Sequence, residues 1–219
     1  MKVGTDGVLL GAWTNPANAK RILDVGTGTG LIAIMMAQRS NAMIDAIEID
    51  KSAYQQAIEN GSSSPWYDRL SFFHSSFEDF IENSKQSYDL IVSNPPFHKE
   101  NINSPHTGRQ LARHSENLDF SKIIESTSKL LKHDGRISLI LPASDEINVN
   151  MIAENHSLYC TRLTHIVPSP EKEFSRSLLE FSLKYQPRVE DIIMIEEKGR
   201  HQYSRGYMRL TRDFYLKFD

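Results

Sequence analysis

The chain has 219 residues, 39% of them hydrophobic, and a formal net charge of −3 at pH 7. This length and hydrophobic content suffice for a full core, so we expect a single domain over residues 1–219. Its one cysteine, Cys160, excludes an intramolecular disulfide, and no apolar stretch approaches the roughly 18 residues of a membrane helix, so we expect a cytoplasmic monomer with no metal site and no membrane anchor. The small negative charge is only weak evidence against a nucleic-acid partner, because the placement of Lys and Arg matters more than their total.

The first predicted element is a glycine-rich segment at residues 2–13. Gly4, Gly7 and Gly11 surround Thr5 and Asp6 there, which is more glycine than an ordinary helix start contains. A simpler interpretation is that Thr5 or Asp6 caps a helix that continues through the apolar residues 8–10. The segment therefore predicts either a specialised loop or a capped helix.

A strand, a glycine turn and a helix follow. The apolar run at residues 21–25 includes Asp24 and leads into Gly26, Gly28 and Gly30, after which residues 31–38 have a helical pattern. Glycine lets the backbone approach a ligand closely, where a Cβ would intrude. The spacing is G-x-G-x-G and differs from the G-x-G-x-x-G of dinucleotide-binding proteins. An ordinary turn between strand and helix is the alternative.

Two further strands are predicted at residues 46–50 and 70–73, separated by a helix at residues 53–60. The first of them ends in acidic residues about 20 residues after the glycine turn. Carboxylates in that place, Glu48 above all, accept hydrogen bonds from ribose hydroxyls in nucleotide-binding α/β folds.

The motif that carries the chemistry follows a buried strand at residues 88–92. Asn94, Pro95, Pro96 and Phe97 lie at its carboxyl end, where ligands of open α/β sheets bind. Proline fixes its own φ angle and restricts the backbone of the residue before it, so the Asn94 side chain and the Pro95 carbonyl can point the same way. Phe97 can then stack on a planar group between them. Such a motif fits an amino group conjugated to a ring or a carbonyl. The alternative is a strand-ending turn with a core phenylalanine.

The second half of the chain predicts the rest of a doubly wound α/β fold. Residues 98–118 read as a polar loop, residues 120–131 as an amphipathic helix that ends near Asp134-Gly135, and residues 136–141 as the fifth strand. Residues 161–167 and 177–185 alternate in polarity and predict a closing antiparallel pair. The tail, residues 200–217, interleaves arginines with tyrosines, which fits either a nucleic-acid surface or arginines that extend over an edge element.

Taken together, these motifs resemble the class I S-adenosylmethionine-dependent methyltransferases that modify amino nitrogens. The opening residues 2–7, the triplet at residues 112–114, the end segment at residues 210–216 and the Asn-Pro-Pro-Phe motif are similar to those of the bacterial tRNA1(Val) (adenine-37-N6)-methyltransferase family. Members of that family usually have a segment before the first motif. The resemblance covers nearly the whole chain and implies a seven-stranded, Rossmann-like methyltransferase sheet with an antiparallel closing hairpin.

The resemblance also assigns site residues. It implies that S-adenosylmethionine is the cofactor, and that its binding residues are Lys2, Thr5, Asp6, Asp24, Gly26, Gly28, Gly30, Glu48, Ile49, Ser76, Phe77, Glu78 and Asn94. Relatives often have Asp in place of Ser76, and Phe77 can equally be a core residue. Substrate contacts are expected from residues on two loops at the site edge, Arg109, Arg113, His114, Lys172 and Arg176, although solvated surface is the simpler interpretation of residues 98–118.

The sequence thus predicts N6-methylation of adenine in tRNA, with Asn94, Pro95, Pro96 and Phe97 as the catalytic motif. N2-guanine methyltransferases of ribosomal RNA and protein-glutamine methyltransferases share that motif, but those families carry an additional amino-terminal domain that residues 1–219 do not contain. A non-catalytic RNA-binding module with the same fold is the alternative of another class, and the intact motifs argue against it.

Overall fold

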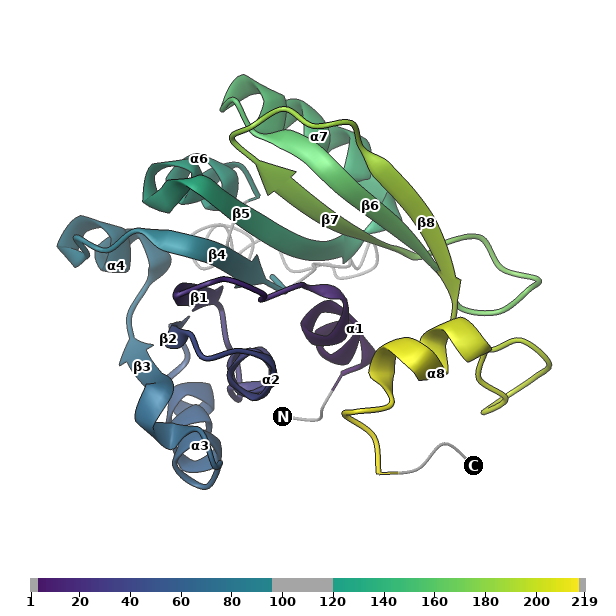
Figure 1. The fold of residues 1–219 in the computed structure, drawn as a ribbon, viewed down its shortest axis with the longest axis horizontal. Helices are drawn as coiled ribbons and strands as arrows, with labels where there is room; N and C mark the ends of the chain where they lie inside the picture. The colour runs from purple at the N-terminus through teal and green to yellow at the C-terminus, as the bar shows by residue number, and fades with distance from the viewer. Residues whose placement is uncertain (1–3, 96–119, 217–219) are drawn as a thin grey trace, which may run out of the picture.

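The computed structural model describes residues 4–95 and 120–216, which form a twisted sheet with helices on both faces (Figure 1). The eight strands lie in the order β3-β2-β1-β4-β5-β7-β6-β8. Their bounds are β1 Arg21–Val25, β2 Met43–Glu48, β3 Leu70–His74, β4 Tyr88–Ser93, β5 Leu131–Pro142, β6 Tyr159–Val167, β7 Arg176–Ser182 and β8 Val189–Met194. Strands β1 to β5 pair in parallel, and β7 lies antiparallel between β5 and β6.

The helices divide between the two faces of the sheet. The described helices are α1 Thr5–Trp13, α2 Leu31–Arg39, α3 Lys51–Ser62, α4 Phe77–Asn83, α6 Phe120–Leu130, α7 Glu146–Asn155 and α8 Arg205–Thr211, with short 3-10 turns at Tyr67–Arg69 and Ala143–Asp145. Helices α1, α2, α3 and α8 cover one face, and α4, α6 and α7 cover the other (Figure 1). Within the described segments no helix is long and apolar enough to cross a membrane.

Successive side chains of the central strands point to opposite faces of the sheet, and this produces two hydrophobic cores. Leu23 and Ile91 belong to the cluster beneath α4, α6 and α7, whereas their neighbours Ile22 and Leu90 belong to the cluster beneath α1, α2 and α8. All four side chains are fully buried. Strands buried on both faces read as continuous apolar runs, which is why β1 and β4 are visible in the sequence.

The expected α/β fold class and the antiparallel pair near the end of the chain are confirmed. The structure adds an eighth strand, β8, which pairs in parallel with β6. Its residues Val189 to Asp191 are exposed, so β8 lacks the apolar pattern by which a buried strand is recognised. The expected helix end near Asp134-Gly135 is wrong: α6 ends at Leu130, and Gly135 lies inside β5.

The topology places a ligand site at one edge of the sheet. From β1 the chain proceeds outward to β2 and β3 and then returns to β4 on the other side of β1. Between β1 and β4 the order reverses, and open α/β sheets bind ligands outside the carboxyl ends of the strands at such a switch point. The glycine turn after β1 and Asn94 after β4 both lie there.

Candidate active site

The glycine turn has a backbone that other residues adopt only with strain. Gly26, Gly28 and Gly30 have φ angles of 71°, 60° and 83°, in the left-handed region that favours glycine. The amides of Gly26 and Thr27 both donate to the Ile47 carbonyl at 3.0 Å, so the turn is fixed to the end of β2. Gly30 is the N-cap of α2, which brings the amino end of that helix to the same edge.

Asp24 lies beneath this turn and is fully buried. Its Oδ2 accepts hydrogen bonds from Thr27 Oγ1 at 2.6 Å and from the Ala33 amide at 3.0 Å. Its Oδ1 has no hydrogen-bond partner among the described residues. Burial raises the pKa of the Asp24 carboxyl to about 7, and the two hydrogen bonds only partly oppose that rise. A positively charged ligand near the turn would favour the ionised form.

Glu48 joins the glycine turn to the start of α3. Its Oε2 accepts from the Gly28 amide at 2.8 Å, and its Oε1 accepts from the Asp50 amide at 2.9 Å. Each carboxylate oxygen can accept a second hydrogen bond. Glu48 can therefore hold the turn in shape and accept hydroxyl hydrogens of a ribose.

Asn94 follows β4 directly and is half-buried, and Pro95 is buried. Ser93 Oγ donates to the Val25 carbonyl at 2.8 Å, which ties the end of β4 to the end of β1. A Cβ added to Gly7 would lie 4.0 Å from Asn94 Nδ2, so α1 passes beside the amide. The Asn94 side chain thus lies beside α1, at the edge where β1 and β4 end.

The segment expected to bind adenine begins α4. Ser76 is the N-cap of this helix: its hydroxyl accepts from the Asp79 amide and donates to Asp79 Oδ2. Phe77 is only 5% exposed and packs in the core beneath α4, α6 and α7, as the core interpretation expects. Glu78 pairs with Lys122 at 3.4 Å, and Ile49 is 55% exposed at the end of β2.

Helix α1 begins at this edge with Thr5, which is exposed, and Asp6, which is half-buried. The interpretation that Thr5 or Asp6 caps the helix is wrong, because Gly4 is the N-cap and no side chain caps it. Asp6 Oδ2 instead accepts a hydrogen bond from Arg176 Nε at 2.8 Å. This ion pair joins the start of α1 to the start of β7 across the site edge.

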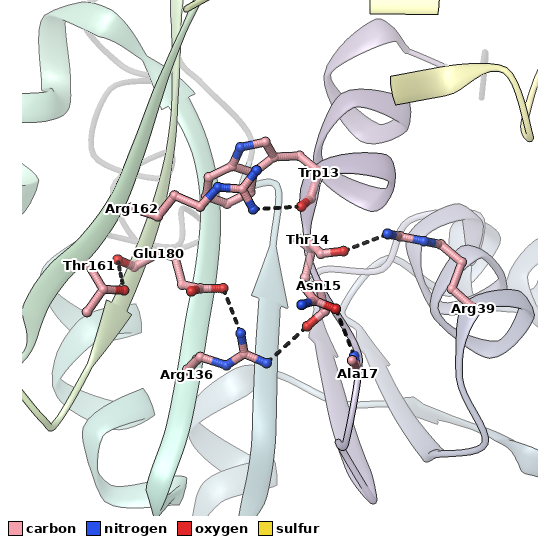
Figure 2. Close-up of polar contacts among 9 residues, drawn as sticks. All are labelled: Trp13, Thr14, Asn15, Ala17, Arg39, Arg136, Thr161, Arg162 and Glu180. Atoms are coloured by element: carbon pink, nitrogen blue, oxygen red, sulfur yellow. Dashed lines mark hydrogen bonds and ion pairs between the residues drawn. The ribbon is translucent and has the colours of Figure 1, made fainter. Parts of the chain in front are cut away.

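The other end of α1 is held by arginines (Figure 2). Arg39 Nη1 donates to the Thr14 carbonyl at 2.6 Å, and Arg162 Nη1 donates to the Trp13 carbonyl at 3.2 Å. The Arg162 guanidinium also lies 4.1 Å from the centroid of the Trp13 ring. Burial lowers the pKa of both guanidinium groups. Cations at a helix carboxyl end interact favourably with its carbonyls and its dipole.

A third arginine completes this arrangement. Arg136 Nη2 donates to the Asn15 carbonyl at 3.0 Å, and its Nη1 pairs with Glu180 Oε2 at 3.3 Å (Figure 2). The arginines come from α2, β5 and β6. They fix the carboxyl end of α1 to α2 and to the sheet, and the amino end of α1 lies at the site. Sequence reasoning missed all three, because isolated arginines carry no local signal of a partner far along the chain.

The remaining predicted site residues are placed as follows. Lys172 is exposed on the loop between β6 and β7. Arg176 starts β7 and is engaged by Asp6, so a contact with substrate phosphate stays a prediction. Six predicted residues lie outside the described ranges: Lys2, Pro96, Phe97, Arg109, Arg113 and His114.

In and around α8 the arginines are exposed, whereas Tyr203 and Tyr207 pack inward. Arg205, Arg209 and Arg212 are exposed along α8 and its carboxyl cap, and their spacing places them on one side of the helix. Tyr207 is 3% exposed and stacks on Tyr203 with 5.3 Å between ring centroids. The tyrosines therefore stabilise the packing of α8, and the arginines form a basic stripe at its surface.

Among residues 4–95 and 120–216, no three His, Cys, Asp or Glu side chains gather so as to hold a metal ion.

Comparison with known proteins gives a family match over most of the chain. The model of the methyltransferase small domain matches residues 4–156. A protein of Flavobacterium psychrophilum named tRNA1(Val) (adenine(37)-N6)-methyltransferase is 47% identical over 222 aligned positions, which cover 99% of this chain and 93% of that protein. Proteins of the same name from Flavobacterium johnsoniae and Parabacteroides distasonis are 45% and 43% identical, again covering 99% of this chain and 93% and 92% of theirs.

Solved structures show the same fold. A crystal structure titled as a predicted O-methyltransferase from Agrobacterium tumefaciens superposes with a TM-score of 0.71 at 18% identity, over 95% of this chain and 96% of that one. The ribosomal protein L11 methylase of Lactobacillus delbrueckii subsp. bulgaricus superposes with a TM-score of 0.60 at 17% identity, over 82% of this chain and 78% of that one. At these identities the likeness concerns the fold alone.

Proposed function

The chain belongs to the family of tRNA1(Val) (adenine(37)-N6)-methyltransferases within the methyltransferase small domain family, and from this premise we propose that it methylates N6 of adenosine 37 in tRNA1(Val). The observation that carries the chemistry is the placement of Asn94 and Pro95 beside the glycine turn at the switch point of the sheet. Since its substrate is tRNA, the enzyme acts in the cytoplasm.

The cofactor of this reaction is S-adenosylmethionine, which supplies an electrophilic methyl group on a sulfonium cation. The described residues fit such a molecule. Gly26 and Gly28 are partly exposed and have no Cβ, so a ligand can approach their backbone, and the Glu48 carboxylate retains capacity to accept ribose hydroxyls. Burial raises the pKa of the Asp24 carboxyl beneath the turn to about 7, so a cationic ligand bound above it would draw this group into its ionised form. Gly26, Gly28, Gly30, Glu48 and Asp24 would hold the cofactor.

Asn94 and Pro95 activate the amino nitrogen by alignment. Adenine N6 is a poor nucleophile because its lone pair is delocalised into the ring, and no ordinary side chain removes its proton outright. If Asn94 Oδ1 and the Pro95 carbonyl each accept one N6 hydrogen, the nitrogen can pyramidalise and direct its lone pair toward the methyl group. Alignment and electrostatic support then provide most of the catalysis, and the proton leaves after transfer. Phe97 lies outside the described residues, and its stacking on the extruded base stays a prediction.

The rim of the site suits a polyanionic substrate. Lys172 is exposed on the loop between β6 and β7, and Arg205 begins α8 after β8, whose carboxyl end lies at the same edge of the sheet. Among the described residues, neither Arg205 nor Arg209 makes an ion pair with a carboxylate. Lys and Arg at the surface supply the salt-dependent part of nucleic-acid affinity.

The test is an Asn94→Ala variant assayed with tRNA and labelled cofactor. We expect a loss of roughly 10²-fold or more in turnover, while cofactor affinity is largely kept. Asn83→Ala is the matched control, because the exposed Asn83 side chain donates to the Asp79 carbonyl at the end of α4, away from the carboxyl ends of β1 and β4. Turnover of Asn94→Ala equal to that of Asn83→Ala would remove Asn94 from the mechanism.

A further inference from the structure

Phe174 presents an aromatic ring at the substrate edge in a fixed orientation. It lies on the loop between β6 and β7, and its ring stacks on His165 with 4.2 Å between centroids and 20° between planes. One face of the ring is therefore covered, yet 47% of the residue's surface remains exposed. An exposed aromatic ring held in a fixed stack offers a flat surface on which a nucleobase can stack.

His165 is in turn held by the framework. Its Nε2 lies 2.8 Å from Glu146 Oε2, and Ser177 Oγ donates to the same oxygen at 2.5 Å. Glu146 begins α7, His165 lies in β6 and Ser177 in β7, so three elements fix the histidine ring. The stack of Phe174 on His165 thus belongs to the packed part of the protein. A ligand that stacks on Phe174 would meet a ring whose orientation is already set, which lowers the entropic cost of binding.

Backbone contacts place the stack close to the catalytic motif. The Ser175 amide donates to the Ile166 carbonyl at 2.9 Å, and the Ala143 amide donates to the Ser175 carbonyl at 3.2 Å. Ala143 directly follows β5, which separates β7 from β4, the strand that ends at Asn94. Two strand spacings, about 10 Å, lie between β4 and β7. A nucleotide next to the one held by Asn94 can cover such a distance.

We propose that Phe174, supported by His165, is a stacking platform for an unpaired nucleobase of the substrate RNA, next to the adenine that is methylated. The inference rests on the proposed function, since it names a further subsite of the same active edge. Single-stranded RNA is recognised through unstacked bases placed on aromatic side chains. Lys172, two residues before Phe174, lies on the same loop between the exposed Glu171 and Glu173, so we expect stacking and not charge to provide the affinity of the platform for a base.

The test compares Phe174→Ala with Phe174→Tyr in methyl transfer to tRNA. Truncation removes the stack, so we expect KM for tRNA to rise by roughly 5- to 150-fold, with cofactor affinity unchanged and with recovery in the Tyr variant. Tyr185→Ala is the matched control: Tyr185 is 75% exposed and packs edge to face with Tyr159, near the opposite ends of these strands.

A fluorescent variant separates stacking from a structural role. In Phe174→Trp, stacking of a base should quench the added tryptophan when tRNA is bound, beyond any change from Trp13 and Trp66 in the unsubstituted protein. No additional quenching, or an unchanged KM for tRNA in Phe174→Ala, would overturn the inference. These results leave the proposed function standing as long as the unsubstituted enzyme methylates tRNA, whereas absence of that activity would overturn the proposed function itself.

Discussion

Substitution of Glu48 tests the cofactor site most directly, because both of its carboxylate oxygens accept backbone hydrogen bonds before any ligand binds. Oε2 accepts from the Gly28 amide at 2.8 Å and Oε1 accepts from the Asp50 amide at 2.9 Å. Glutamine has the same shape but only one acceptor oxygen. In Glu48→Gln, one backbone N–H must therefore face an NH₂ group. A hydrogen bond to a charged group contributes about 1.5–3 kcal/mol, so we expect unfolding free energy to fall by about that amount.

Cofactor affinity should fall as well, because a ribose hydroxyl loses the same acceptor. A loss of about 1.5–3 kcal/mol corresponds to a rise of roughly 10- to 150-fold in Kd. Calorimetric titration with S-adenosylmethionine gives Kd, and urea unfolding without cofactor gives stability. Glu125→Gln is the control, since Glu125 makes an exposed pair with Lys129 on α6. If Glu48→Gln lost stability but bound cofactor as tightly as the control, Glu48 would only shape the turn, and the reasoning about ribose would be wrong.

Three further predictions concern stability. Burial raises the pKa of Asp24 to about 7, so between about pH 4 and pH 7 the folded protein binds more protons than the unfolded chain, and its stability falls as pH rises through that window. In Asp24→Asn, the urea midpoint should therefore fall less over the same pH range. An identical pH profile of the two proteins would contradict the assignment. A double-mutant cycle with Asp6→Ala and Arg176→Ala should give a coupling energy of about 0.5–1 kcal/mol in urea unfolding, because the pair is half-buried. If the losses of unfolding free energy in the two single variants add up to the loss in the double variant, the contact contributes nothing. Gly135→Ala should cost about 1–3 kcal/mol, because its Cβ would lie 2.8 Å from the Tyr88 carbonyl oxygen. Gly206→Ala in α8 should not destabilise, because its Cβ would meet only Ser204 Oγ at 3.8 Å. Equal midpoints of the two variants would refute this.

Much of the fold is readable from local patterns. Strand β1 and the glycine turn carry an apolar run followed by glycines whose positive φ angles only glycine tolerates well, and β4 ends in the Asn94-Pro95 motif. These features depend on residues close together in the chain, so spacing alone predicts them. Their meeting at one edge follows from the parallel order of the strands.

Contacts between distant segments are not readable in this way. The ion pair of Asp6 with Arg176 spans 170 residues, and the arginines that hold α1 come from three other elements. A single arginine has the same local appearance whether it binds a helix end, a carboxylate or solvent. Phe77 illustrates the same point, because the seven-residue helix α4 is too short for periodicity to decide between core and ligand.

The most direct test of the central claim is methyl transfer from labelled S-adenosylmethionine to total RNA from a strain that lacks this gene, compared with RNA from its parent, followed by nucleoside analysis. We predict N6-methyladenosine in tRNA, at position 37 of tRNA1(Val), with RNA from the deletion strain only. Label in another nucleoside would keep the methyltransferase fold and contradict the assigned substrate. Label entering protein and not RNA would show that the amide motif recognises a glutamine side chain.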